Sequence, residues 1–357
     1  MDSNRTNTTN VTALLNGSTI EGPNWTFTPS FTLFIQLSAF VNNGAMVVVF
    51  ARNAALITPF TVYLFNLFAS NFIVSIFFYS IELINELYSA WWLGYAMCTM
   101  FQYTSWVLTG SMCIAHGTIA LNRLWAVSFP VSYRRYHKKR FAVAVIATLW
   151  ISLHIIVIPG LVLDAVWYRP PMETNGCNIN TDAPQAWLWF AQLVIMDTPV
   201  VIVVAVYPII CYKTIQRNRA RVRPAGATGT KMASRRQRAP STVSPSVRSD
   251  LEASVSVRAG GEKQIEHRML CCRLPGVRRG NGHGFLALTL MTSTVLLCYS
   301  PASVYFTLYI CFNIDVPGMF SKVMILYELA AVLDPIWFML SLSSLRAAFR
   351  RTFIPCH

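Results

Sequence analysis

The chain has 357 residues, of which 54% are hydrophobic and only 12% are charged, and its formal net charge is +14. Soluble globular domains carry about 25% charged residues, so this composition excludes an ordinary soluble domain and indicates a membrane protein. The positive charge lies mainly in loops and in one tail, which argues against nucleic acid as a partner.

Seven apolar segments are each long enough to cross a hydrocarbon core of ~30 Å. They cover residues 30–51, 61–85, 97–122, 142–163, 186–212, 284–311 and 319–342. The sequence therefore predicts an all-α membrane protein, with a seven-transmembrane helix bundle over residues 30–342. An odd number of spans puts the two ends of the chain on opposite sides of the membrane.

The basic residues predict the orientation of this bundle. All Lys and Arg except Arg5, Arg169 and Lys322 fall in the loops after the first, third and fifth segments, in the C-terminal tail, or at position 123. Because positively charged loops stay in the cytosol, we expect the C-terminus there and the N-terminus outside a cell whose plasma membrane holds the bundle. Some of these basic residues are also expected to contact anionic lipid headgroups.

Residues 1–29 form a polar N-terminal tail without the apolar core of a cleaved signal peptide. The tail contains five Asn-x-Ser/Thr acceptor sites for N-glycosylation, at Asn4, Asn7, Asn10, Asn16 and Asn24. We expect an extracellular, glycosylated tail; the alternative is a disordered tail in which these sites occur by chance.

Two cysteines lie on the outer side of the predicted bundle. Cys98 opens the third segment, and Cys177 lies in the long outer loop between the fourth and fifth segments. Because this side is oxidising, a Cys98–Cys177 disulfide is predicted. On the inner side, residues 217–280 are rich in Arg, Ser, Pro, Gly and Ala, and we expect a disordered third cytoplasmic loop.

Each predicted span carries at least one residue that resembles a motif of rhodopsin-like (class A) G-protein-coupled receptors. The matching single positions are Asn43, Asn66, Asn71, Pro130, Trp150, Pro199 and Tyr207. Asn122-Arg123-Leu124 resembles the DRY motif, Cys298-Tyr299-Ser300-Pro301 resembles CWxP, and Asp334-Pro335-Ile336-Trp337-Phe338 resembles NPxxY. Residues 343–357 resemble the family's short amphipathic eighth helix and tail, with a palmitoylation site at Cys356.

This resemblance implies a receptor that binds an extracellular ligand and activates a heterotrimeric G protein, with arrestin and receptor kinases as further partners. The residues that it implies for coupling and switching are Asn122, Arg123, Pro130, Tyr207, Tyr299, Pro301, Asp334, Pro335 and Phe338. A polar site in the core is implied at Asn43, Asn71 and Asp334. No cofactor and no metal site is expected.

Two departures from the family pattern have consequences. Asn122 replaces the acid that restrains the arginine in most relatives, so we expect appreciable signalling without ligand. Asn71 stands where the family has a sodium-binding aspartate, while Asp334 replaces an asparagine, and Met112 replaces a serine that assists the ion. The sodium site is therefore in doubt, and Asp334 is expected to carry a proton or to bond Asn71.

A ligand pocket is expected in the outer half of the bundle. Its predicted residues are Glu82, Ser105, Trp106, Thr109, Tyr299, Ser303, Phe306, Tyr327 and Glu328. Ser105 stands where monoamine receptors carry their amine-binding aspartate, so the charge of a cationic small molecule or peptide would instead be met by Glu82 and Glu328. The alternatives are that Glu82 reaches the headgroup region and that Glu328 bonds Asn71 or a hydroxyl.

Other classes of protein fit less well. No motif of a hydrolase, nucleotide-binding enzyme or metalloenzyme occurs, so we expect no enzyme. A transporter is disfavoured because the seven segments show no repeated halves. The remaining alternative is a receptor-like seven-helix protein that does not signal itself and acts as a dimer partner, scavenger or trafficking factor.

Overall fold

The computed structural model describes residues 22–172, 176–180, 184–222, 282–314 and 316–354. The chain divides into two compact units, residues 1–217 with 282–357 and residues 218–281. Most of the predicted third cytoplasmic loop lies outside the described residues, as do Asn4, Asn7, Asn10, Asn16 and Cys356.

Seven long helices follow one another along the described chain, which confirms the predicted bundle. The first two are α1 (Phe27–Arg52) and α2 (Thr61–Leu87), and the last is α12 (Met319–Ser341). The other four each contain a π-helical turn, η2 (Ser105–Thr109), η3 (Asp164–Tyr168), η4 (Gln192–Asp197) or η7 (Val295–Tyr299). The α-helical parts around these turns are α3 (Gly94–Thr104), α4 (Gly110–Ser128), α6 (Lys139–Leu163), α8 (Gln185–Ala191), α9 (Thr198–Val222), α10 (Gly282–Thr294) and α11 (Ser300–Phe312).

Six of these helices are long and apolar enough to cross a membrane. The third helix, made of α3, η2 and α4, is not among the six because it carries many polar side chains. Those of Gln102, Thr109, Ser111, His116 and Asn122 are all buried, so they meet other helices and not lipid. Backbone polar groups inside a bilayer must bond within the protein, which a helix achieves by itself. The chain is therefore a multi-pass membrane protein whose third helix supplies much of a polar core.

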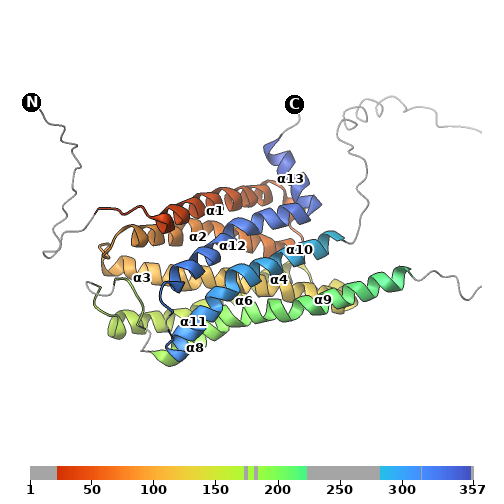
Figure 1. Cartoon of the computed structure of the whole chain (residues 1–357). Coiled ribbons are helices and arrows are strands. Elements are labelled where there is room, and N and C mark those ends of the chain that lie inside the picture. The colour runs from red at the N-terminus through yellow and green to blue at the C-terminus, as the bar shows by residue number, and fades with distance from the viewer. Residues whose placement is uncertain (1–21, 173–175, 181–183, 223–281, 315, 355–357) are drawn as a thin grey trace, which may run out of the picture. The chain divides into compact units, whose positions relative to one another are not determined.

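The helices pack side by side, with α1 against both α2 and α12, and with α2 against α4 and α6 (Figure 1). Two side-chain amides tie the neighbouring helices together. Asn43 on α1 donates to the carbonyl oxygen of Ala331 on α12 at 2.9 Å. The indole of Trp150 on α6 donates to Asn66 on α2, also at 2.9 Å.

A glycine allows α6 to approach the start of the fifth helix. A Cβ atom built on Gly160 would lie 1.9 Å from the indole ring of Trp187 on α8. The same indole donates to the carbonyl oxygen of Ile156 at 2.7 Å. Any larger side chain at position 160 would displace the indole and break this contact, so this residue fixes where the fifth helix begins.

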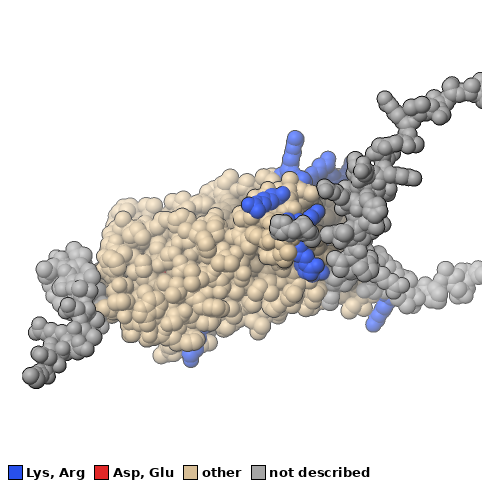
Figure 2. Space-filling model, turned by 90° about the horizontal axis from the view of Figure 1, so that it is seen from above, with Lys and Arg blue, Asp and Glu red and all other residues tan. Residues whose placement is uncertain are grey.

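Short helices gather at one end of the bundle. They are η1 (Ala54–Leu56), α5 (Pro130–Tyr136) and α13 (Ser343–Phe353), the predicted eighth helix. Exposed Lys and Arg also collect at this end, while the body beside it shows one further basic side chain at its lower edge and no acidic side chain on the face drawn in Figure 2. A basic end beside a flank with almost no charged side chains is the pattern expected of a bundle that lies in a lipid bilayer.

Candidate functional site

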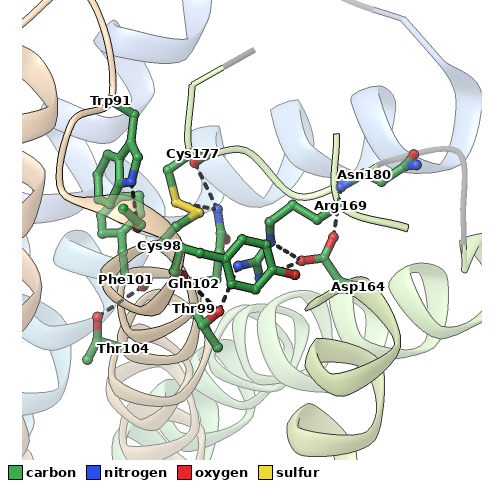
Figure 3. The surroundings of a disulfide bond; sticks show 12 residues. Trp91, Cys98, Thr99, Phe101, Gln102, Thr104, Asp164, Arg169, Cys177 and Asn180 are labelled. Carbon is green, nitrogen blue, oxygen red and sulfur yellow. Dashed lines mark hydrogen bonds and ion pairs between the residues drawn. A yellow bond between two sulfur atoms is a disulfide. The ribbon is translucent and has the colours of Figure 1, made fainter. Parts of the chain in front are cut away.

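At the other end of the bundle, an outer loop is fastened to the third helix by the predicted disulfide. Cys98 on α3 is bonded to Cys177 (Figure 3), which confirms that prediction. One turn further along α3, the side-chain amide of Gln102 donates to the carbonyl oxygen of Cys177 at 3.0 Å. These two bonds hold residues 176–180 against the third helix.

A buried ion pair fastens the same loop to the fourth helix. Arg169 donates to Asp164 Oδ2 from Nε and Nη2, at 2.8 and 2.7 Å, and from Nη1 to the hydroxyl of Thr99 at 2.7 Å. The other carboxylate oxygen of Asp164 accepts from the backbone N–H of Asn180 at 3.2 Å (Figure 3). Arg169 is one of the three basic residues that lie outside the predicted cytosolic segments. Its ion pair with Asp164 explains why a basic residue occurs at this position.

Beneath this loop the helices enclose a cavity of about 660 Å³. Eight of the nine predicted pocket residues line it: Glu82, Ser105, Trp106, Thr109, Tyr299, Ser303, Phe306 and Tyr327. Residues 177–180 of the loop also contribute to the wall. Three of the π-helical turns, η2, η4 and η7, supply lining residues, and such turns occur often at functional sites because they redirect side chains.

Glu82 is the only charged residue among the described residues that line the cavity. It is 5% exposed, and neither of the two described ion pairs includes it. Aromatic rings make up much of the remaining wall: Phe78, Phe101, Trp106, Tyr299, Tyr305, Phe306, Tyr309, Phe320 and Tyr327. A single carboxylate in an aromatic cavity favours a ligand with one positive charge and an apolar body.

Glu328 lies outside the lining, contrary to its predicted position in the pocket. It is buried on α12 and accepts a hydrogen bond at Oε2 from the hydroxyl of Thr32 on α1, at 3.4 Å. The register of α12 turns this side chain towards α1, whereas the preceding residue, Tyr327, faces the cavity. The structure therefore agrees with the alternative in which a hydroxyl bonds Glu328.

An acid that sequence analysis missed lies behind the cavity wall. Asp197 on η4 accepts hydrogen bonds from Ser303 at 2.5 Å, from Thr307 at 2.8 Å and from Gln192 at 3.0 Å. It thereby ties the fifth helix to the sixth beside two lining residues. An acid within an apolar span is a functional candidate by default, and that signal could have identified it.

Aromatic rings connect the cavity with the centre of the bundle. The ring of Tyr299 packs edge-on against Tyr327, with centroids 4.9 Å apart, and against His116, with centroids 5.1 Å apart. The hydroxyl of Tyr327 donates to the carbonyl oxygen of Thr109 at 2.9 Å. Tyr299 of the sixth helix, which lines the cavity, therefore contacts residues of the third and seventh helices directly.

Below these rings lies a polar cluster on three helices. Asp334 accepts from Asn71 Nδ2 on α2 at 3.1 Å, and its other oxygen lies 3.1 Å from His116 Nε2 on α4. The predicted bond between Asn71 and Asp334 is thus present. Asn43, predicted for the same site, bonds the carbonyl oxygens of Ala39 and Ala331 instead. His116 was not assigned to this site, although an ionisable residue within a membrane span is itself a signal for a polar site.

The inner end of the third helix has its own contacts. Arg123 has no ion pair with any residue of the described chain, and its guanidinium lies over the ring of Phe60. Asn122 donates to His137 Nε2 at 2.8 Å and accepts from the hydroxyl of Tyr133 at 3.1 Å. Burial lowers the pKa of His137, which fits its role as an acceptor, because only the neutral imidazole can accept.

The remaining predicted switch residues lie along the fifth, sixth and seventh helices. The hydroxyl of Tyr207 bonds that of Thr289 on α10 at 3.3 Å, so it does not reach Arg123 here. Pro301 follows the π-helical turn η7, and Pro335 lies inside α12, where a proline removes one backbone hydrogen bond. Phe338 packs edge-on against Phe68, and Pro130 begins α5.

Comparison with known proteins identifies relatives of this chain. The sequence profile of the family described as "7 transmembrane receptor (rhodopsin family)" matches residues 42–338. The chain is 28% identical to the tyramine receptor Ser-2 of Caenorhabditis elegans over 158 residues, which are 44% of the chain and 34% of that receptor. It is 24% identical to the alpha-2B adrenergic receptor of Echinops telfairi over 200 residues, 55% of the chain and 51% of that receptor.

A third relative has a similar degree of likeness. The alpha-2B adrenergic receptor of Rattus norvegicus is 25% identical over 150 residues, 42% of the chain and 33% of that receptor. The matched part of the chain thus spans between a third and a half of the length of these relatives.

Proposed function

Since the chain belongs to the rhodopsin family of seven-transmembrane receptors, we propose that it binds an extracellular ligand in the outer cavity and converts binding into activation of a heterotrimeric G protein. In this proposal the disulfide end faces outwards, the basic end faces the cytosol, and the bundle lies in the plasma membrane. Arrestin and receptor kinases would act at the same cytosolic end.

The observation that carries this proposal is a continuous series of contacts from the cavity wall to the helix pivots. Tyr299 lines the cavity and packs on His116, and His116 contacts Asp334, which precedes Pro335 in α12. Tyr299 also lies two residues before Pro301 in the sixth helix. A ligand that displaces this ring would therefore act on two proline-containing helices at once, and such helices can pivot at the proline.

The ligand of this receptor is a small cationic molecule. A cavity of about 660 Å³ lies within the range of small-molecule sites, ~300–1,000 Å³. Glu82 supplies its only negative charge among the described lining residues, and the aromatic rings offer faces to a cation. The charge of the ligand would be met from α2 and not from the third helix, where Ser105 is neutral. One of the relatives is named as a receptor for an amine, tyramine.

The proposal is tested by a panel of biogenic amines, tyramine included, on cells that express the chain. The readout is dissociation of G proteins of the four Gα classes, with Arg123→Ala at matched surface expression as the control. We expect at least one amine to act on the wild type and not on the variant. If no amine in the panel causes G-protein dissociation in any of the four Gα classes, the amine proposal is overturned. If the wild type and Arg123→Ala respond equally, coupling through Arg123 is overturned.

A further inference from the structure

Asp334 lies in the middle of a membrane-spanning helix and is 1% exposed. An isolated carboxylate is very costly to bury in a medium of low dielectric constant, so a buried one is neutralised or paired. The salt bridges of the described residues pair Asp334 with neither Lys nor Arg. His116, also 1% exposed, is the partner that remains.

The hydrogen bonds of His116 determine how many protons the pair contains. Nδ1 lies 2.9 Å from the carbonyl oxygen of Met112, and a carbonyl oxygen can only accept, so Nδ1 carries a proton. In a neutral imidazole Nε2 would then be an acceptor. It lies 3.1 Å from Oδ1 of Asp334, and an ionised carboxylate is an acceptor too. Two acceptors at this distance repel each other, so the contact needs one further proton.

His154 shows that this conclusion is specific to His116. Its Nδ1 likewise bonds a carbonyl oxygen one turn back, that of Trp150, at 2.7 Å. Its Nε2, however, lies 3.0 Å from the hydroxyl of Tyr103, which can donate. A neutral His154 therefore satisfies both of its contacts, and no additional proton is needed there.

The other titratable side chains that interact with this pair are phenols and thiols. Among the described residues they are Tyr79 on α2, Cys113 on α4, and Cys298 and Tyr299 on η7. Phenols and thiols are uncharged near neutral pH in their ordinary state. None of them offers a charge to balance Asp334, so the balance falls to the pair itself.

We propose that His116 and Asp334 form a proton-binding site in the centre of the bundle, which holds one proton between Nε2 and Oδ1. The proton is taken up from water and resides either on Nε2, as imidazolium and carboxylate, or on Oδ1, as imidazole and carboxylic acid. The pair has no net charge in either form. A proton thus does what a bound cation would otherwise do for the buried acid.

The position of this site couples the proton to the packing of α4 against α12. Tyr299 packs on the ring of His116, and Asp334 is adjacent to Pro335. Loss of the proton would leave two acceptors facing each other between α4 and α12, which would push these helices apart. The rival occupant is a sodium ion held by the carboxylate and by Asn71 Oδ1, an oxygen without a hydrogen-bond partner among the described residues.

The proton can be observed directly in the purified full-length chain. Labelling histidine with ¹⁵N and recording solid-state NMR near neutral pH distinguishes imidazolium from imidazole, and infrared difference spectra against Asp334→Asn detect a carboxylic acid. We expect either an imidazolium signal that disappears in His116→Gln and persists in His154→Gln, or an acid C=O band that disappears in Asp334→Asn. A neutral His116 together with an ionised Asp334 would overturn the proposal.

A second measurement tests whether sodium occupies the site instead of the proton. The melting temperature of the wild-type chain is compared in NaCl and in KCl at equal ionic strength. We expect no sodium-specific shift, because the proton already neutralises the site. If sodium raises the melting temperature in a saturable way, and Asp334→Asn abolishes this rise, then a sodium ion and not a proton neutralises Asp334. Neither measurement depends on a ligand or a G protein, so each stands apart from the proposed receptor function.

Discussion

The guanidinium group of Arg123 lies over the ring of Phe60, with Cζ 3.5 Å from the ring centroid. In relatives with the DRY motif an acid restrains this arginine, whereas here an aromatic face at the start of α2 takes that place. A cation–π contact contributes ~0.5–2 kcal/mol, less than a buried ion pair can. We therefore expect the resting state of the proposed receptor to be held only weakly at this end of the third helix.

Replacing Phe60 by Leu removes the aromatic face and should raise signalling in the absence of ligand. The loss of ~0.5–2 kcal/mol corresponds to a roughly 2- to 30-fold shift of the resting equilibrium. Ligand-free G-protein dissociation measures this shift at matched surface expression. Phe60→Tyr keeps the ring face and should behave like the wild type; an equal increase in both variants would show that the stacking contact is not the restraint.

Asn122→Asp should have the opposite effect, because it adds a carboxylate beside Arg123. A coupling of ~1–3 kcal/mol would lower basal signalling by roughly 5- to 150-fold. The control is Asn122→Ala, which removes the bonds to His137 and Tyr133 without adding a charge. If Asn122→Asp leaves basal signalling unchanged, the missing acid is not the cause of weak restraint.

The contact between Asn122 and His137 should be sensitive to acid. Burial lowers the pKa of His137, so the folded protein keeps the imidazole neutral and the bond from Asn122 intact above the unfolded pKa of ~6.5. Stability is lost as the pH falls through the lowered pKa, since the imidazolium cannot accept. We expect the melting temperature to fall more between about pH 7.5 and about pH 5.5, roughly one unit either side of the unfolded pKa of ~6.5, in the wild type than in His137→Gln. Equal slopes would contradict this role.

Glu82→Gln should weaken the response to a cationic agonist from the proposed panel. A hydrogen bond to a charged group contributes ~1.5–3 kcal/mol, which corresponds to a roughly 10- to 150-fold loss of potency. Glu86→Gln is the matched control, because Glu86 lies one turn away on α2 and does not line the cavity. If the dose–response curve shifts equally in both variants, Glu82 does not contact the ligand directly and contributes only to the total negative charge of α2.

Arg169→Met should destabilise the outer loop, because it leaves Asp164 fully buried and without its cation. Breaking one partner of a buried ion pair costs ~3–5 kcal/mol. The double variant Arg169→Met with Asp164→Asn removes the stranded charge and should recover part of the melting temperature. If the double variant does not recover, the loss of melting temperature arises instead from the missing contacts of Arg169 with Thr99 and Tyr95.

Hydropathy, charge bias and motif spacing predicted the seven helices, the amphipathic helix at the C-terminal end and the Cys98–Cys177 disulfide. These features depend on segment length and on which side of the membrane a residue lies, and both can be counted along the chain. Pocket residues such as Ser105 and Tyr299 could be assigned because the motifs fix the rotation of each helix relative to the bundle axis.

What could not be predicted depends on contacts between distant helices. The π-helical turns shift the register of a helix by one residue, and apolar sequence carries no marker for them. Whether His116 meets Asp334 depends on such a shift at η2, whereas whether Glu328 faces α1 or the cavity depends on how α12 packs against its neighbours. The bonds from Ser303 and Thr307 to Asp197 likewise join the fifth and sixth helices, and no local pattern connects those three positions.

The most direct test of the receptor account is ligand-free G-protein dissociation in cells, across the four Gα classes, for the wild type against Arg123→Ala at matched surface expression. Because Arg123 contacts an aromatic ring and pairs with no acid among the described residues, we predict a basal signal in at least one class that Arg123→Ala abolishes. A wild-type signal no higher than that of Arg123→Ala in all four classes would contradict the predicted basal activity and would leave either a strictly ligand-dependent receptor or a receptor-like protein that does not signal.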